Sequence, residues 1–493
     1  MLSLDLTLAP QIEPGSDCAK LVTSVDHASD ELKLLGHAST STDVGQSEEH
    51  EYKTAPLVTC DAYLNLQPTV RPSQYGVLGT VLSIEDKNSR NVPQDPRLYF
   101  NTDAPLSAIV CGVQGSGKSH TVSVMLDNML ISHYADIGNS QKALAGLVLH
   151  FGEGGPSSLP NETAWLGRVK QSGVKAPHVR VFVSKSSLQT MKQVYAPLGD
   201  SVTIEPLVFS EKELDAEAIL SMMAVGSSDA APLYMHTVLS ILRDLGERFT
   251  YSAFKNKLSQ CNADFNPAQK AGLKQRMALL EEFVDSSPTA DKTRFAEGQL
   301  TIIDMSDPYV DPAAACSLFE IITRLFVRAD VRTGKVLVVD EAHKYLRANK
   351  GNSGLTRALL SLIRQQRHLA MRVVISTQEP TVVPPVLLDL CGVTILHRFS
   401  SPSWFTHLIK HVSADISEEA FDKVVRLRTG EAMVFAPAGL WLLSDALSLG
   451  GSGSETMSVD NKRVMQFGRR YLLVKSRQRV TADGGASILV VGP

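Results

Sequence analysis

The sequence predicts an α/β protein with a central, mainly parallel sheet. Short apolar runs suited to buried strands occur at 107–111, 145–149, 300–305, 335–340 and 373–376. Stretches with helical spacing separate several of them, for example at 120–131, 312–328 and 354–368. Strand, helix and strand in succession is the pattern of parallel α/β sheets. A glycine-rich loop directly after the run at 107–111 points the same way. The length of 493 residues favours a large core with insertions, or two to three domains.

Two segments are expected before the core. Residues 1–55 mix Ser, Thr, Asp, Glu, Gly and His without sustained periodicity. Such a stretch cannot bury enough apolar surface to offset its ordering entropy, so we expect a flexible leader. Residues 56–100 contain short β-like runs, such as GVLGTVLSI at 76–84, with turn residues between them. This pattern indicates a small N-terminal β module.

The core is expected in two parts, 101–150 and 299–448. The intervening residues 151–298 include strand-like runs, but helical spacing dominates at 213–223, 233–245 and 268–283. We therefore expect a mixed, mainly helical insertion at 151–298. Further apolar runs near 392–396, 432–436 and 440–443 complete the predicted sheet.

The sequence after the core changes character. LGGSGS at 449–454 indicates a flexible linker, which we assign to 449–463, followed by a C-terminal segment at 464–493. The basic run KSRQR at 475–479 fits either contact with a phosphate backbone or a solvated tail.

The glycine-rich loop GVQGSGKS at 112–119 fits the pattern G-x-x-x-x-G-K-[ST] at every fixed position. Glycines let the backbone wrap an anion with its N–H groups inward, and the following helix adds its positive N-terminal end. Lys118 is expected to reach the β- and γ-phosphates of ATP, and Ser119 to ligate Mg²⁺. The alternative is a chance glycine-rich turn. The residues expected to bind nucleotide are Gly112, Gly115, Ser116, Gly117, Lys118, Ser119 and His120.

An acidic pair, Asp340-Glu341, ends the apolar run at 335–340. Because parallel strands deliver their carboxyl ends to one sheet edge, the pair is expected close to the glycine-rich loop. Asp340 would hold Mg²⁺ through water, and Glu341 would polarise the attacking water. The alternative is an ordinary strand that ends in a solvated acidic turn.

Three further polar residues are catalytic candidates. Gln378 follows the run at 373–376, where a polar side chain can sense the γ-phosphate or orient water. Arg364 and Arg367 are three residues apart, which places both on one face of the predicted helix. One of them could act across a subunit boundary as an arginine finger. A surface glutamine and a solvated helix face are the alternatives.

The composition excludes several classes of protein. With 48 basic and 52 acidic side chains the net charge is −4, so nucleic acid would have to be met by a local basic surface. The six cysteines are scattered, without zinc spacing, which favours free thiols in a reducing compartment. No run of 18 apolar residues and no secretory signal occurs, so we expect no membrane span and an intracellular location, cytoplasmic or nuclear.

The order of these motifs resembles the HerA/FtsK superfamily of hexameric P-loop ATPases, and most of all HerA-like translocases. The resemblance covers about residues 98–437, and the motifs that carry it are GVQGSGKS, LTIIDMS, VLVVDEAHKYL, IRQQRHLAMRVVISTQEP, LLDLCGVTILHRFSSP and TGEAMVFAP. It implies a RecA-like P-loop NTPase core with Lys118 and Ser119 at phosphate and Mg²⁺. It also implies Glu341 as the catalytic carboxylate, Gln378 as sensor and Arg367, with Arg364 second, as the arginine that acts in trans.

The resemblance further implies an ATP-driven homohexameric ring that moves duplex DNA, with a nuclease as a candidate partner. The chain departs from the family at His150, where an Asp is usual, and at the following turn Phe151-Gly152-Glu153. These departures bear on what is translocated. The main alternative is an ATP-dependent oligomeric switch or scaffold without translocation, favoured by the acidic charge balance. A transport motor like the conjugation ATPases is a third reading, weakened by the lack of a membrane anchor.

Overall fold

The computed structural model describes residues 43–223, 234–261, 265–285, 293–346, 354–416, 419–445 and 461–485. It divides into two units, Met1–Tyr52 and Lys53–Pro493. Helix α2 (Asp43–Thr54) spans the boundary between them, and all other described elements belong to the second unit. Most of the expected leader, and the linker residues 449–460, lie outside the described residues.

Parallel strands form the centre of the second unit. Their spatial order is β9-β8-β12-β7-β13-β14-β5-β15. Strand β14 therefore lies between β5, which precedes the glycine-rich loop, and β13, which precedes the acidic pair. The bounds are β5 (Ser107–Cys111), β7 (Ala145–His150), β8 (His178–Val183), β9 (Val202–Pro206), β12 (Gln299–Asp304), β13 (Lys335–Val339), β14 (Met371–Thr377) and β15 (Val393–Leu396). The predicted α/β class with a mainly parallel sheet is confirmed.

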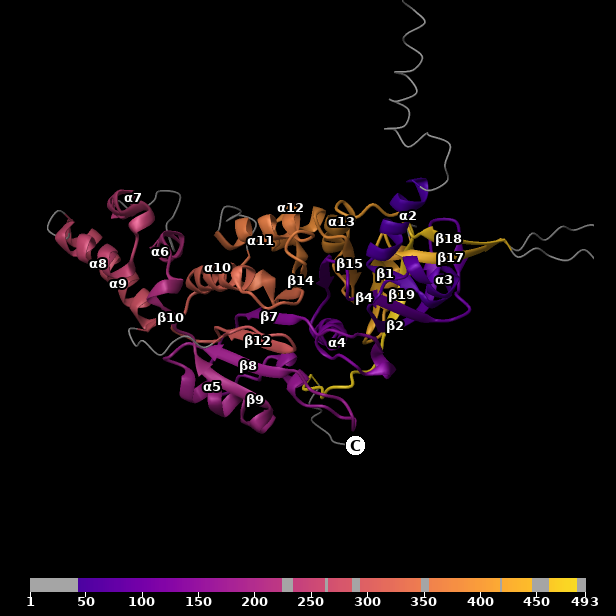
Figure 1. Ribbon diagram of the computed structural model, residues 1–493, viewed down its shortest axis with the longest axis horizontal. Helices are drawn as coiled ribbons and strands as arrows, with labels where there is room; N and C mark the ends of the chain where they lie inside the picture. The colour runs from indigo at the N-terminus through magenta and orange to yellow at the C-terminus, as the bar shows by residue number, and fades with distance from the viewer. Residues whose placement is uncertain are drawn as a thin grey trace, which may run out of the picture. The chain divides into compact units, whose positions relative to one another are not determined.

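Both faces of this sheet are covered, which explains why its strands read as continuous apolar runs. Ile109 and Cys111 of β5 belong to a core with helices α10 (Pro312–Arg328) and α11 (Gly354–Gln365). The alternate residues Ala108 and Val110 belong to a core with α4 (Lys118–Leu130) and α5 (Leu188–Val194). Figure 1 shows α10 and α11 above strands β7 and β12, α5 below them, and α4 to their right.

The sheet continues beyond β15 in antiparallel fashion. The order is β15-β16-β19-β2-β4-β1, and β1 pairs in parallel with β17, which pairs with β18. Strands β2, β4 and β1 of the expected N-terminal module thus lie together, between β19 of the expected C-terminal segment and β17. The bounds are β1 (Leu57–Thr59), β2 (Tyr75–Glu85), β3 (Arg90–Asn91), β4 (Arg97–Asn101), β6 (Gly138–Asn139), β16 (Glu431–Phe435), β17 (Leu440–Asp445), β18 (Asn461–Gln466) and β19 (Tyr471–Ser476).

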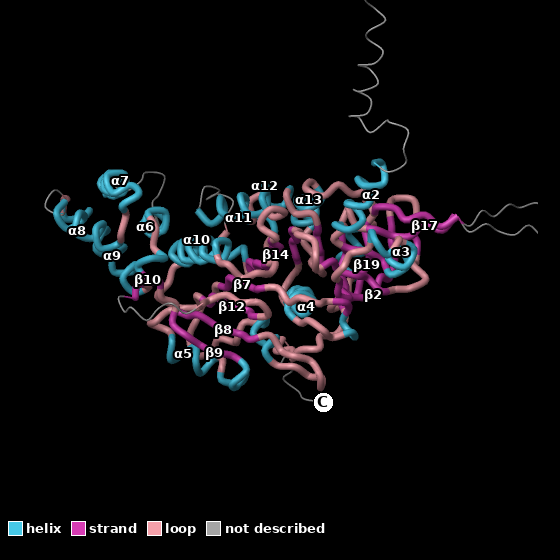
Figure 2. The backbone as a smooth tube through the Cα atoms, viewed as in Figure 1, coloured by secondary structure: helices cyan, strands magenta, loops and turns pink. Residues whose placement is uncertain are grey.

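Helices form a separate layer within the 151–298 stretch. They are α6 (Ala216–Met223), α7 (Tyr234–Leu245), α8 (Tyr251–Gln260) and α9 (Pro267–Glu282), beside a small sheet of β10 (Phe209–Ser210) and β11 (Val284–Asp285). Figure 2 shows these helices grouped at the left of the view, to one side of the parallel strands. The earlier part of the stretch contributes β8 and β9, which extend the parallel sheet. The remaining helices are α3 (Cys60–Asn65), α12 (Pro385–Asp389), α13 (Pro402–Ile409) and α14 (Ala420–Arg426).

Within the described ranges, no helix has the length and apolar character that crossing a lipid bilayer requires. Cys60, Cys111, Cys261 and Cys391 are free cysteines.

Candidate nucleotide-binding site

The glycine-rich loop has the backbone conformation that its glycines allow. Gly112, Gly115 and Gly117 have φ values of 154°, 72° and 110°. L side chains rarely adopt such values, which explains why glycine stands at these positions. Gly117 is the N-cap of α4, and its carbonyl accepts the first helical bond, from Thr121 N at 3.0 Å. The free N–H groups at the start of α4 are therefore available to an anion.

Lys118 is a buried cation beside this helix start. Its side chain is 4% exposed, and its Nζ donates to Val113 O at 3.4 Å. Burial lowers the pKa of Lys118, while the nearby Glu341 and Asp340 carboxylates oppose that shift. A polyphosphate placed in the loop would supply the anionic partner that a buried ammonium group favours. The loop therefore fits the nucleotide phosphates expected there.

Asp340 follows β13 and is held firmly through one oxygen. His150 Nδ1 and Asn161 Nδ2 each lie 3.0 Å from its Oδ2. Burial acts to raise the pKa of Asp340, but these hydrogen bonds, the His150 charge and Lys118 together hold it below its usual value. Tyr345 donates to the backbone carbonyl of Asp340 at 2.8 Å. The carboxylate is thus kept ionised with its other oxygen, Oδ1, left for a ligand.

The donor set fits Mg²⁺ held jointly with a nucleotide. No group of three His, Cys, Asp or Glu side chains able to bind a metal occurs among the described residues. Mg²⁺ typically takes only one or two protein ligands at phosphate sites and completes its shell with water and phosphate oxygens. The Ser119 hydroxyl and Asp340 match that need.

Glu341 lies in a strained conformation with φ at 50°. Its two carboxylate oxygens both accept from Gln378 Nε2, each at 2.9 Å. His343 Nε2 lies 3.4 Å from Oε2, and His343 Nδ1 accepts from the Gln378 backbone N–H, so the ring proton is on Nε2 and faces Glu341. A left-handed non-glycine residue costs about 1–2 kcal/mol. The structure thus joins Gln378 and Glu341, two of the predicted catalytic residues, at the carboxyl ends of neighbouring strands.

The predicted arginine pair does not share a helix face. Helix α11 ends at Gln365, so Arg364 lies in its last turn and Arg367 in the turn that follows. The helix stops because the chain must reverse into β14, a reversal that Ala370 makes with φ at 46°. The expectation of one shared helical face was therefore wrong. Both side chains are exposed to solvent.

His120 points away from the loop that precedes it. Its Nε2 lies 2.8 Å from Arg477 O, and its Nδ1 lies 3.3 Å from Asp483 Oδ2. The ring therefore contacts a segment that follows β19. Ser116 likewise uses its hydroxyl within the loop, where it donates to Val113 O at 2.6 Å.

Two residues beside the loop were missed by sequence reasoning. The backbone N–H of His397, after β15, donates to Cys111 O at 2.8 Å, and its Nδ1 lies 2.9 Å from Glu431 O. Burial lowers the pKa of this fully buried histidine to about 4, so the ring is neutral. Gly430 N donates to Ser116 O at 3.1 Å. Neither residue belongs to a sequence motif with a known chemical role. Only the order of the strands in the sheet shows that they lie beside the loop.

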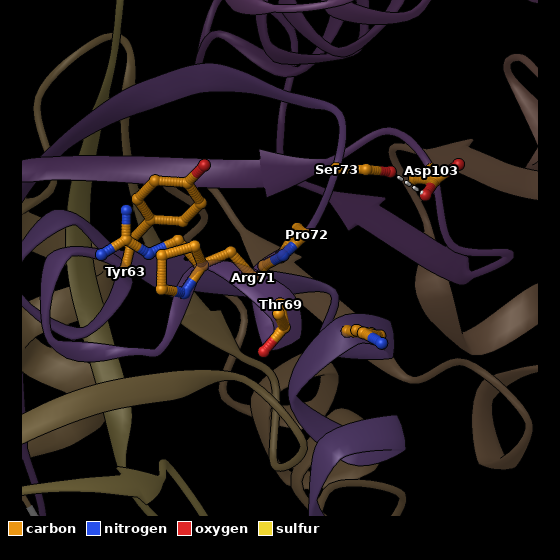
Figure 3. Close-up of a pocket in the computed structure, with 8 residues that line it drawn as sticks. Tyr63, Thr69, Arg71, Pro72, Ser73 and Asp103 are labelled. Atoms are coloured by element: carbon orange, nitrogen blue, oxygen red, sulfur yellow. Dashed lines mark hydrogen bonds between the residues drawn. The ribbon is translucent and has the colours of Figure 1, made fainter.

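Figure 3 shows a pocket that is lined by residues outside these motifs. It has a volume of about 450 Å³ and is lined by Lys53, Tyr63, Pro68, Thr69, Arg71, Pro72, Ser73 and Asp103. Ser73 donates to Asp103, and the Arg71 guanidinium lies 5.1 Å from the centre of the Tyr63 ring. None of the predicted nucleotide-site residues lines it.

No known protein-family model and no curated protein matches this chain. Among solved structures, it is similar to the genome packaging NTPase B204 from Sulfolobus turreted icosahedral virus 2 in complex with AMP, at 12% identity and a TM-score of 0.29, over 67% of this chain and 92% of that one. It is similar to VirB4 of Thermoanaerobacter pseudethanolicus, at 12% identity and a TM-score of 0.44, over 83% and 98%. It is also similar to the bacterial conjugative coupling protein TrwBΔN70, at 12% identity and a TM-score of 0.41, over 87% and 95%. With every TM-score below 0.5, the assignment of a function rests on the geometry above.

Proposed function

We propose that this chain is an ATPase that hydrolyses Mg-ATP at the glycine-rich loop and uses the energy to move duplex DNA. The observation that supports hydrolysis best is the Gln378–Glu341 pair. Glu341 follows β13, Gln378 follows β14, and β14 also pairs with β5, the strand before the loop. A partly buried base, a phosphate-binding helix start and a polar orienting group therefore meet at one edge of the sheet.

Each residue has a distinct task in this proposal. The loop N–H groups and Lys118 bind the β- and γ-phosphates, while Ser119 and Asp340 would hold the Mg²⁺. A bound Mg²⁺ would help neutralise the charge on those phosphates. A carboxylate has about four acceptor positions, and Gln378 uses one on each oxygen of Glu341, while His343 Nε2 lies 3.4 Å from Oε2. A further position on Oε1 can accept the proton of an attacking water.

The chemical step follows from this arrangement. The water oxygen forms a bond to the γ-phosphorus, its proton passes to Glu341, and the bond from that phosphorus to the bridging oxygen of ADP breaks. Gln378 and His343 keep the Glu341 carboxylate in place during the transfer. The strained backbone at Glu341 fits a residue held for chemistry at some cost in stability.

We also propose that the subunits form a ring and that the ring moves duplex DNA. Arg364 and Arg367 are exposed, as a residue must be to reach the site of a neighbouring subunit in a homohexamer. Movement of duplex DNA is supported by the order of the motifs, which resembles HerA-like translocases. The same resemblance to HerA-like translocases supports a nuclease as a partner. The net charge of −4 favours the second candidate, an ATP-dependent oligomeric switch or scaffold that threads no polymer.

The first test measures ATP turnover with and without duplex DNA. We expect turnover in the wild type, stimulated by DNA, and none in Lys118→Ala or Glu341→Gln. The matched control is Glu247→Gln, which makes the same change at an exposed carboxylate after α7 and should keep wild-type turnover. Turnover that survives Glu341→Gln would contradict the assignment of the base.

The second test separates the two candidates. A motor should displace a third strand from a DNA triplex in an ATP-dependent manner, and electron microscopy with a non-hydrolysable ATP analogue should show rings with DNA in the pore. Rings that form with the analogue but never displace the third strand would favour the switch or scaffold.

A further inference from the structure

The segment after β19 crosses one face of the helix that begins at the glycine-rich loop. We call residues 476–485 the C-terminal strap. The α4 residues that bond to it are His120 and Thr121 in the first turn, and Asp127 and Asn128 about two turns later. A spacing of seven residues returns to the same helix face, so the strap runs along α4 and does not merely touch its end.

The first contact lies next to the phosphate-binding residues. His120 comes two residues after Lys118, and its ring lies 2.8 Å from Arg477 O and 3.3 Å from Asp483 Oδ2. Thr121 Oγ1 lies 2.7 Å from Ser476 Oγ. Ser476 N in turn donates to Gly430 O at 2.9 Å, and Gly430 N donates to Ser116 O. The strap is therefore linked to the glycine-rich loop through Gly430, and to the start of α4 directly through His120 and Thr121.

The second contact is a buried ionic cluster. The Asp127 side chain is fully buried, and it accepts from Thr481 Oγ1 at 2.9 Å and lies 3.5 Å from Arg477 Nη1. Arg477 Nη2 also donates to Asn128 Oδ1 at 2.8 Å, and its Nε to Val77 O at 2.7 Å. A buried carboxylate that loses its cationic partner is strongly unfavourable. The charges of Asp127 and Arg477 therefore require each other, which fixes the strap against α4.

The far end of the strap is held to a different part of the fold. The buried Arg479 guanidinium donates to Glu162 Oε1 at 2.5 Å. Lys170 N donates to Val480 O at 2.9 Å, and Ala482 N donates to Arg168 O at 2.6 Å. The strap is therefore attached both to α4 and to the 162–170 stretch.

We propose that the C-terminal strap is part of the nucleotide site because it sets the orientation of α4, and that Arg477 and Arg479 are positioning residues for ATP binding. This inference rests on the proposed function. The N–H groups of the loop bind phosphate only when α4 points at it, and a misplacement of about 1 Å can cost on the order of a hundredfold. Coupling is reciprocal, so bound nucleotide must also hold the strap more tightly.

The test measures equilibrium binding of adenylyl imidodiphosphate with Mg²⁺ by calorimetry. We expect Arg477→Gln and Asp127→Asn each to weaken binding by at least about tenfold. The double variant Arg477→Gln, Asp127→Asn should return to within about threefold of the wild type, because both buried charges leave together and amide hydrogen bonds remain. A loss of packing alone would give no such recovery. Arg463→Gln, the same change at an exposed arginine of β18, should bind as the wild type does.

Two more measurements keep the proposal open to refutation if a single variant folds poorly. His120→Ala removes no buried charge and should still weaken binding. In the wild type, the analogue should slow amide hydrogen exchange at residues 477–482. Wild-type affinity in His120→Ala and in Arg477→Gln would overturn the strap proposal. A wild-type protein that binds no nucleotide at all would instead overturn the proposed function, and the strap proposal with it.

Discussion

The glycine-rich loop offers a matched pair of substitutions whose costs differ for a reason visible in the structure. Gly115 and Gly117 both have φ values in the left-handed range. A Cβ added at Gly115 would meet no atom within 4 Å, whereas one added at Gly117 would lie 2.8 Å from Gly430 N and 3.0 Å from Gly430 Cα. Alanine at either position carries backbone strain, more at Gly117 because its φ of 110° lies farther from the left-handed region than the 72° of Gly115. At Gly117 the added Cβ also collides with backbone that cannot rotate away.

The magnitudes follow from these two terms. The strain of a left-handed alanine is about 1–2 kcal/mol, offset at both sites by the lower entropy of the unfolded chain, about 0.4–1 kcal/mol. The entropy contribution is shared and cancels in a comparison, and the strain is at least as large at Gly117. The collision at Gly117 adds about 1–3 kcal/mol, the usual cost of overpacking, and disturbs the bond from Gly430 N to Ser116 O. Gly117→Ala should therefore destabilise the protein by about 1–3 kcal/mol more than Gly115→Ala does.

The assay is urea unfolding of the nucleotide-free protein, followed by circular dichroism for each variant and the wild type. Nucleotide is left out because a Cβ at Gly115 could collide with a bound phosphate and confuse the comparison. Equal destabilisation by the two alanines would show that Gly430 does not press on the loop in solution. A larger effect at Gly115 would refute the described loop geometry.

Three further predictions concern the chemistry and the pH dependence. Gln378→Ala should lower kcat about a hundredfold while leaving ATP affinity within about threefold, because the amide holds Glu341 and no loop residue; a raised kcat would show that Gln378 restrains the base. Asp340→Asn should raise the Mg²⁺ concentration needed for half-maximal turnover by at least about tenfold, measured by Mg²⁺ titration. Burial raises the pKa of Glu162 from 4.5 to about 7, and the Arg479 charge opposes this rise. Between pH 4.5 and 7 the folded state therefore binds more protons than the unfolded state, so the free energy of unfolding should fall as the pH rises through that interval. Glu162→Gln should flatten the curve of unfolding free energy against pH by at most roughly 3 kcal/mol, and an unchanged slope would count against a buried, protonated Glu162.

The candidate site residues that the sequence predicts are those encoded within a few residues. The strand, glycines and lysine at 107–118 form one continuous unit, so their pattern predicts both conformation and chemistry. Asp340, Glu341 and Gln378 could be predicted because each directly follows an apolar strand, and parallel strands bring such ends to one edge. The position of β14 between β5 and β13 was not predictable from spacing, because strand order depends on pairings between distant residues.

Other features were hidden because their meaning depends on tertiary packing. The run KSRQR at 475–479 offered phosphate contact or a solvated tail, whereas Arg477 is in fact partly buried beside Asp127, and Arg479 is buried beside Glu162. Nothing near these residues in the sequence shows that their hydrogen-bond partners lie more than 300 positions earlier. Arg367 was placed on the helix because the apolar spacing continues to residue 368. The chain reversal at Ala370 is a local event that ends the helix earlier, at Gln365.

The strap along α4 also orders events in time during synthesis of the chain. His120 and Arg477 are 357 residues apart. At about 5–20 residues per second, a ribosome needs roughly 20–70 s between making one and the other. For that interval the strand β5, the loop and α4 exist without their strap, with the Asp127 carboxylate lacking its cation. If the strap orients α4 as proposed, a nascent chain should gain nucleotide affinity only after residues 476–485 have been made.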